Sequence, residues 1–193
     1  MKLVLASKNA HKLVEMRDIL SQLGVEVVLE SEVGVDVDVE ETGATFEENA
    51  FLKARAVMEA SGLPAIADDS GLCVDALNGA PGVYSARYGG PGLDDVGRYR
   101  LLLENMQGQL DRRCRCLRHL LLLSQRGPGG GRGSVPAPGL RPQGEDGFGY
   151  DPFFVPALKK TFAELSPAEK NAISHRGNAL TAFREKLEQY LNK

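Results

Sequence analysis

The sequence is poor in cysteine, lacks long apolar runs and carries no excess of positive charge. Its three cysteines, Cys73, Cys114 and Cys116, have neither a disulfide-framework spacing nor a zinc-ligand spacing. The apolar runs fall far short of the ~20 residues that a membrane span needs. A net charge of −3 gives no basic field for nucleic acid. Because the first residues also lack a signal-peptide layout, we expect a cytoplasmic protein with neither membrane nor nucleic acid as partner.

What remains is the composition of a soluble globular protein. With 193 residues, of which 42% are hydrophobic and 25% charged, the chain can bury a sizeable core, and we expect a single domain over residues 1–193. Strands over residues 2–6 and 25–29, separated by a helix that ends at Gly24, predict an α/β sheet. Further helices are expected over residues 45–61, 94–106 and 178–191.

Residues 112–144 are unlike the rest of the chain. This window contains no acidic residue, although the whole chain has 26 and its composition predicts roughly four there. It holds seven arginines, seven glycines and four prolines, and residues 112–119 show neither strand alternation nor a helical face.

Three hypotheses account for this segment. It is a disordered basic insertion that binds an acidic partner, a poorly packed but genuine hairpin, or a stretch translated in a shifted reading frame. We favour the shifted frame, because a GC-rich gene yields Arg, Gly, Pro and Ala codons out of frame, and ordinary sequence resumes at Glu145.

The first candidate site is the polar turn over residues 7–12, between the first strand and the first helix. Free backbone N–H groups and the positive end of a helix favour an anion here, and Lys8 and Lys12 add charge. The glycines of a Walker A loop are absent. The alternative is an ordinary turn with solvated lysines.

Two pairs of acids are the second candidate. Glu40-Glu41 lies in an acidic stretch, and Asp68-Asp69 is expected to end a short apolar strand over residues 65–67. Carboxylates suit hard divalent cations, and a cation between two adjacent acids would keep both ionised. The alternatives are a solvated acidic loop for the first pair and a turn with Asx hydrogen bonds for the second.

Two candidates lie near the carboxyl end. The stretch over residues 147–152 alternates glycine with aromatics, which lets a flat base approach the backbone and stack. Lys170, His175 and Arg176 supply donors for a base or phosphate oxygen. A turn with core aromatics and ordinary surface charge are the respective alternatives.

Taken together and in order, these blocks resemble the inosine/xanthosine triphosphate pyrophosphatase family. The resemblance covers about residues 1–111 and 145–193. It rests on VLASKNAHK (4–12), ETGATFEENA (41–50), ADDSGL (67–72), GAPGVYSARY (79–88), GFGYDP (147–152) and SHRG (174–177).

The resemblance implies an elongated α/β fold, with a mixed central sheet flanked by helices and two lobes around a nucleotide-binding cleft. It also implies a homodimer, Mg²⁺ as cofactor with Glu41 and Asp69 as its ligands, Asp69 as catalytic base and Asp68 in support. The substrate-binding residues it implies are Ser7, Lys8, Asn9, Ala10, His11, Lys12, Lys53, Ser70, Phe148, Gly149, Tyr150, Asp151, Lys170, His175 and Arg176.

The activity implied is hydrolysis of deaminated purine nucleoside triphosphates, namely ITP, dITP and XTP, to the monophosphate and pyrophosphate. The alternative is a nucleotide-binding module of the same fold whose turnover is impaired by residues 112–144, where relatives carry sheet strands. The related septum-inhibitor type of nucleotide pyrophosphatase is a second enzymatic alternative, which the block over residues 174–177 disfavours.

Overall fold

The computed structural model describes residues 1–111, 113–124, 129–137, 139–140, 154–155, 160–166, 169, 172–173 and 175–191. The chain divides into two compact units, the first made of Met1–Asp69, Arg118–Gly133 and Ala179–Lys193, and the second of Ser70–Leu117 and Ser134–Asn178. None of the helices in these described ranges combines the length and the apolar character needed to cross a bilayer.

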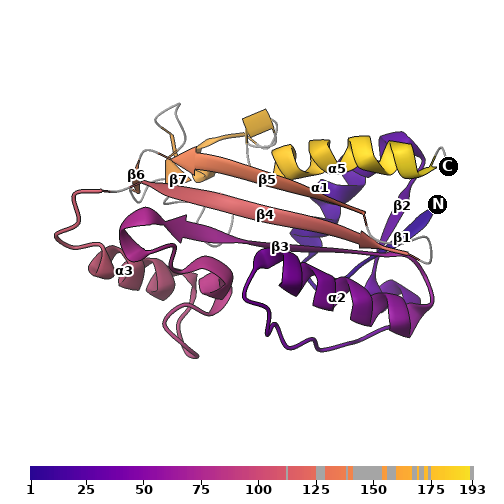
Figure 1. The fold of residues 1–193 in the computed structure, drawn as a ribbon, viewed down its shortest axis with the longest axis horizontal. Helices are drawn as coiled ribbons and strands as arrows, with labels where there is room; N and C mark the ends of the chain where they lie inside the picture. Colours follow the sequence, from indigo (N-terminus) through magenta and orange to yellow (C-terminus); the bar gives the residue numbers. More distant parts are fainter. Residues whose placement is uncertain are drawn as a thin grey trace. The chain divides into compact units, whose positions relative to one another are not determined.

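A mixed sheet runs through the molecule, in the order β2-β1-β3-β4-β5 (Figure 1). Its strands are β1 (Lys2–Leu5), β2 (Glu26–Leu29), β3 (Ala65–Val74), β4 (Cys114–Leu123) and β5 (Gly129–Ala137). β1 is parallel to both β2 and β3. β3 and β4 are antiparallel, since the N–H of Asp75 donates to the carbonyl of Arg113 at 3.0 Å while Asp68 contacts Arg118. The predicted α/β class with a mixed sheet is therefore confirmed.

The remaining elements are mostly helical. The α-helices are α1 (Ala10–Leu20), α2 (Phe46–Ser61), α3 (Asp95–Asn105) and α5 (His175–Leu191). Short 3-10 turns are η1 (Ser21–Leu23), η2 (Glu30–Val33), η3 (Asp75–Leu77), η4 (Gly82–Arg87) and η6 (Phe162–Glu164). A small antiparallel pair joins β6 (Gly139–Leu140) to β7 (Phe154–Val155).

Local sequence sets the ends of α2. The N–H of Glu48 donates to the Thr45 hydroxyl at 3.2 Å, and the Glu48 carboxylate accepts from the N–H of Thr45 at 3.1 Å. This reciprocal capping box satisfies donors that the first helical turn leaves free. Gly62 ends the helix in the left-handed conformation with φ 68°. The predicted helix over residues 45–61 is thus confirmed, with its cap.

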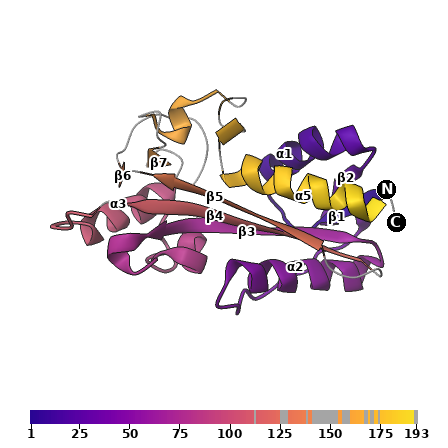
Figure 2. The same cartoon turned by 45° about the horizontal axis from the view of Figure 1, so that its top comes forward.

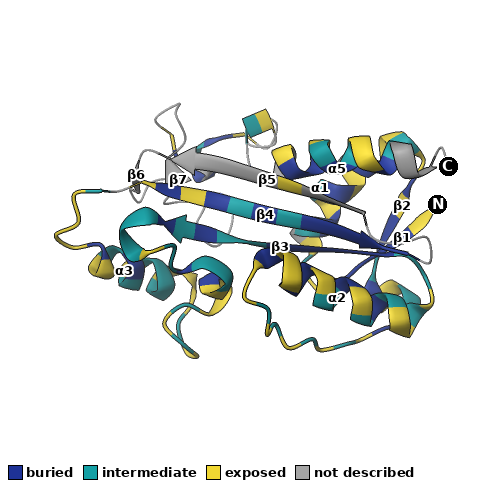
Figure 3. Cartoon of the chain, viewed as in Figure 1, coloured by how far each residue is buried: buried dark blue, intermediate teal, exposed yellow. Residues whose placement is uncertain are grey.

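The first unit is a three-layer sandwich, with α1 and α5 on one face of the sheet and α2 on the other (Figure 2). Alternation along the strands produces this arrangement, because successive side chains point to opposite faces. In β1, Leu3 and Leu5 pack in the cluster that includes α1 and α5, whereas Val4 packs in the cluster that includes α2. Both faces are covered, so β1 after Lys2 and the first half of β3 are buried (Figure 3).

The second unit has a smaller core of its own. Leu102 and Met106, on and just after α3, pack against Leu72 and Val74 of β3. Cys114 and Cys116 of β4 are buried in this cluster, and neither is in a disulfide. They act as small apolar side chains here, in keeping with the absence of a disulfide pattern.

Two expectations about local structure need correction. β3 does not end before Asp68 but continues to Val74, so both acids lie inside a strand rather than in a turn. Burial continues past the acids to Leu72 and Val74, which explains why the strand does not stop. α1 begins at Ala10, so the expected polar turn includes the first helical turn. The window over residues 112–144 contributes strands β4 and β5.

Candidate functional site

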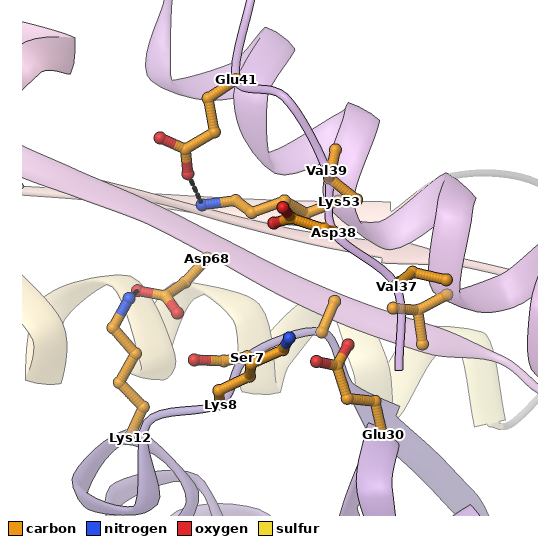
Figure 4. Close-up of a pocket in the computed structure, with 12 residues that line it drawn as sticks. Ser7, Lys8, Lys12, Glu30, Val37, Asp38, Val39, Glu41, Lys53 and Asp68 are labelled. Carbon is orange, nitrogen blue, oxygen red and sulfur yellow. Dashed lines mark hydrogen bonds and ion pairs between the residues drawn. The ribbon is translucent and has the colours of Figure 1, made fainter. Parts of the chain in front are cut away.

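A cavity of about 240 Å³ lies in the first unit (Figure 4). It is built from the turn after β1, the start of η2, the loop before α2, and side chains from α2 and β3. Its lining residues are Ala6, Ser7, Lys8, Lys12, Glu30, Val37, Asp38, Val39, Glu41, Lys53, Val57 and Asp68. Three lysines and four acids therefore face the same space.

The turn after β1 is organised by its own polar side chains. The N–H of Asn9 donates to the Ser7 hydroxyl at 3.1 Å, and the N–H of Lys12 donates to the Asn9 side chain at 3.4 Å. Asn9 thereby caps α1, which leaves the positive end of the helix beside the cavity. Lys8 is an exposed partner of Asp36 at 2.6 Å.

The neighbouring acids Asp68 and Asp69 serve opposite faces of the sheet. Side chains alternate along a strand, so Asp68 points to the same face as Ile66, which packs in the cluster with α1 and α5. Asp69 points to the same face as Ala67, which packs in the cluster with α2. The two carboxylates contact different side-chain cations, Lys12 and Arg118 for Asp68 and Lys53 for Asp69.

Asp68 is wholly buried between two cations. Its Oδ2 lies 3.1 Å from Lys12 Nζ and 3.3 Å from Arg118 Nε, and its side chain is 0% exposed. Burial alone would raise the pKa of this carboxyl, but the charges of Arg118, Lys12 and Lys53 outweigh burial and lower the pKa. Asp68 is consequently held as an anion that helps to place Lys12.

Asp69 and Glu41 converge on one ammonium group. Lys53 Nζ of α2 lies 2.8 Å from Glu41 Oε1 and 2.8 Å from Asp69 Oδ1. Burial raises the pKa of Asp69, and the charge of Lys53 offsets part of that rise. The pKa of Lys53 is raised, because attraction to Asp69 and Asp68 outweighs its burial. Two carboxylate oxygens within contact of one point are suited to holding a cation.

A strict metal cluster is not preformed in the part of the chain that the structure describes. Within it, no group of three or more His, Cys, Asp or Glu side chains is arranged to hold an ion. Glu41 and Asp69 are the two carboxylates that share a contact point. Mg²⁺ in proteins commonly takes one or two carboxylates and completes its shell with water and substrate phosphates.

Two polar residues near the cavity were missed by sequence reasoning. Glu30 lines the cavity at 4% exposure, and its burial raises its pKa. Asn49 of α2 is fully buried and donates to Asp69 at 3.4 Å. Neither stood out, because Glu30 follows a strand as a surface acid would and Asn49 lies inside an ordinary capping motif.

Ser70, His175 and Ala10, three further expected site residues, do not line this cavity. Ser70 follows Asp69 in β3 and is partly buried, and His175 begins α5 at 5% exposure. Ala10 is the exposed first residue of α1. Outside the described residues lie Phe148, Gly149, Tyr150, Asp151 and Lys170, together with the side chains of His11 and Arg176.

Comparison with known proteins settles the family. The family model for the Ham1 family matches residues 3–186. The chain belongs to the Ham1 family. Among curated Ham1 relatives, it is 46% identical to the dITP/XTP pyrophosphatase of Nitrosomonas europaea over 200 residues, which cover 97% of this chain and 95% of that protein. It is 48% identical over 193 residues to the dITP/XTP pyrophosphatase of Escherichia coli K12, with 96% and 98% covered.

Solved Ham1 structures match the fold as well. The Ham1 protein of Staphylococcus aureus superposes with a TM-score of 0.90 at 40% identity, covering 98% of this chain and all (100%) of that one. The Ham1 protein of Coxiella burnetii gives 0.89 at 42% identity, covering 100% of this chain and 98% of that one. The resemblance drawn from the ordered sequence blocks is therefore confirmed.

Proposed function

We propose that this chain hydrolyses deaminated purine nucleoside triphosphates, namely dITP, XTP and ITP, to the monophosphate and pyrophosphate. The main support is sequence identity of 46% and 48%, along almost the whole chain, to two proteins named dITP/XTP pyrophosphatase. The cavity supports this activity, since it gathers three lysines and four acids in one unit.

Charge around the cavity supports Mg²⁺ as the cofactor. Three lysines against four acids cannot by themselves attract a polyphosphate. Glu41 and Asp69 are the residues that would hold Mg²⁺, because both already contact the Lys53 cation. When bound there, Mg²⁺ would neutralise phosphate charge and lower the pKa of a bound water.

The chain's own residues supply the rest of the reaction. Asp69 takes a proton from the attacking water, and the raised pKa of this buried carboxyl strengthens it as a base. The water oxygen bonds to the α-phosphorus while the bond from that phosphorus to the bridging oxygen breaks. Lys12 and Lys53 stabilise the charge that develops on the departing pyrophosphate.

Specificity rests on the purine C6 position. Inosine and xanthosine carry an oxygen there, where adenine carries an amino group. A donor from His175 or Arg176 is satisfied by the oxygen and left unpaired by the amino group, which costs about 1–3 kcal/mol for each buried contact. Two such donors would reject ATP by a few orders of magnitude. Lys170 is proposed to assist, and Phe148 to Asp151 to pack on the base and ribose.

Two broader expectations belong to the same proposal. The homodimer follows from the family resemblance, and the cytoplasmic location follows from the cysteine and amino-terminal patterns of the sequence. Light scattering of the purified chain tests the dimer, and cell fractionation tests the location.

Pyrophosphate release from ITP with Mg²⁺, beside ATP and an Asp69→Asn variant, tests the activity. We expect ITP-selective release of pyrophosphate rather than phosphate, and a loss of about a thousandfold in kcat for Asp69→Asn. Asp111→Asn makes the same change at a side chain 39% exposed in the second unit and should leave kcat unchanged. Tight ITP binding without release would instead indicate an impaired binding module.

A further inference from the structure

Asn49 is a buried amide on the otherwise apolar buried face of α2. Its side chain is 0% exposed, and its neighbours on the buried side of the helix are Phe46, Ala50 and Ala54. A buried amide costs free energy unless its donor and acceptor find partners. Its contacts therefore indicate why an apolar residue does not occupy this position.

Both ends of the amide have a partner, and the two partners belong to different parts of the site. Oδ1 accepts a hydrogen bond from the N–H of Gly43 at 2.8 Å, and Nδ2 lies 3.4 Å from Asp69 Oδ2. Because a backbone N–H can only donate, the amide oxygen must face Gly43. The NH₂ group is thereby turned toward Asp69 and cannot flip without losing its anchor.

The anchor is a close approach that requires glycine. A Cβ on residue 43 would lie 2.7 Å from Asn49 Oδ1 and 2.7 Å from Glu48 Cβ, so a side chain there would push the loop away. Gly43 is two residues beyond Glu41, which contacts Lys53. The amide therefore connects the loop that carries Glu41 to the strand that carries Asp69.

Asp69 is held at both of its oxygens by α2. The ammonium group of Lys53 donates to Oδ1 at 2.8 Å, and the amide of Asn49 donates to Oδ2. Two donors on different oxygens restrict rotation of the carboxylate plane. We propose that Asn49 is a positioning residue for the pyrophosphatase reaction, orienting the Asp69 carboxylate from a fixed anchor at Gly43. This inference rests on the proposed function.

Asn49→Asp keeps an acceptor for Gly43 and replaces the NH₂ donor with an oxygen, so it removes the hydrogen bond to Asp69 and places a second carboxyl beside that side chain. Misplacement of a reacting group by about 1 Å costs about a hundredfold in rate. We expect kcat for ITP to fall about a hundredfold, with the ITP KM within about twofold of the wild-type value. Asn105→Asp is the matched control, since Asn105 is the exposed last residue of α3 and its amide donates to the Tyr88 hydroxyl, and both constants should stay unchanged.

Urea unfolding of each variant separates positioning from folding. A wild-type kcat for Asn49→Asp, or a kcat loss that matches a loss of folded protein, overturns the inference. If the wild-type chain releases no pyrophosphate from ITP, the proposed function fails instead, and the next measurement still decides the role of Asn49.

The side-chain amide of Asn49 gives a readout that needs no turnover. In a ¹H–¹⁵N spectrum, the NH₂ pair that disappears in Asn49→Asp is assigned to Asn49. We expect this pair to shift in Asp69→Asn and to stay in place in Asp111→Asn. If the NH₂ resonances of Asn49 do not shift in Asp69→Asn, the amide does not hold this carboxylate.

Discussion

At the residue scale, the alternation of side chains along β3 gives the adjacent acids Asp68 and Asp69 different partners. Asp68 lies with Lys12 and Arg118 on one face, and Asp69 lies with Lys53 and Asn49 on the other. The two carboxylates carry opposite pKa shifts, down for Asp68 and up for Asp69. One acid is kept as a permanent anion, while the other is poised to exchange a proton.

These opposite shifts predict opposite effects on acid stability. Since the pKa of Asp68 is lowered in the fold, its contribution is present above the ordinary aspartate pKa, about 4, and is lost as pH falls below it. We expect Asp68→Asn to take up about one proton fewer on unfolding in this acid range. Urea unfolding of the metal-free chain at a series of pH values measures the slope.

Asp69→Asn provides the contrast for that experiment. The pKa of Asp69 is raised, so its contribution is present below the ordinary pKa and is lost as pH rises through the raised value. This variant should keep the steep acid slope of the wild type. Equal slopes for Asp68→Asn and the wild type would contradict the assignment of Asp68 as the buried anion.

The sequence predicted some of the residues near the cavity but not their partners. Two pairs of adjacent acids, Glu40-Glu41 and Asp68-Asp69, and a pair of lysines are visible in a linear pattern, and the family resemblance added Lys53. Asn49 was not predicted, because its role depends on how closely the loop at Gly43 passes the helix. Such an approach is a property of tertiary packing and leaves no periodic signal.

At the element scale, β4 carries a charged side chain at a fully buried position. Its inward positions run Cys114, Cys116, Arg118, Leu120 and Leu122, all buried. Arg118 is 0% exposed and pairs with Glu15 of α1 at 3.4 Å and with Asp68 at 3.3 Å. Among the described residues, no atom accepts a hydrogen bond from its Nη2. An arginine at an inward position breaks the alternation by which a strand is predicted, whereas α2 was predictable from its cap alone.

Removing the charge of Arg118 should be costly, because Asp68 would stay buried with one cation fewer. We expect Arg118→Leu to lower the free energy of unfolding by about 3–5 kcal/mol. Arg115→Leu is the matched control on the same strand, since Arg115 is 56% exposed and pairs with Asp75 at 2.9 Å. That variant should lose less than about 1 kcal/mol. Equal losses in urea unfolding would show that the buried pairs of Arg118 contribute nothing particular.

At the scale of the whole molecule, the segment over residues 112–144 belongs to both compact units. Cys114 and Cys116 pack in the core of the second unit, and Leu120 and Leu122 pack in the core of the first. Any error in this segment would therefore alter both cores. The origin of this acid-free segment, in a chain with 26 acidic residues, therefore matters for the packing of the entire fold.

The shifted reading frame remains our prediction for this segment. We expect the gene to contain two compensating insertions or deletions around it, and the corrected window to contain acidic residues. Resequencing the gene, together with the intact mass of the natural protein, decides the matter, since a mass equal to that of the printed 20.8 kDa chain would exclude the shift.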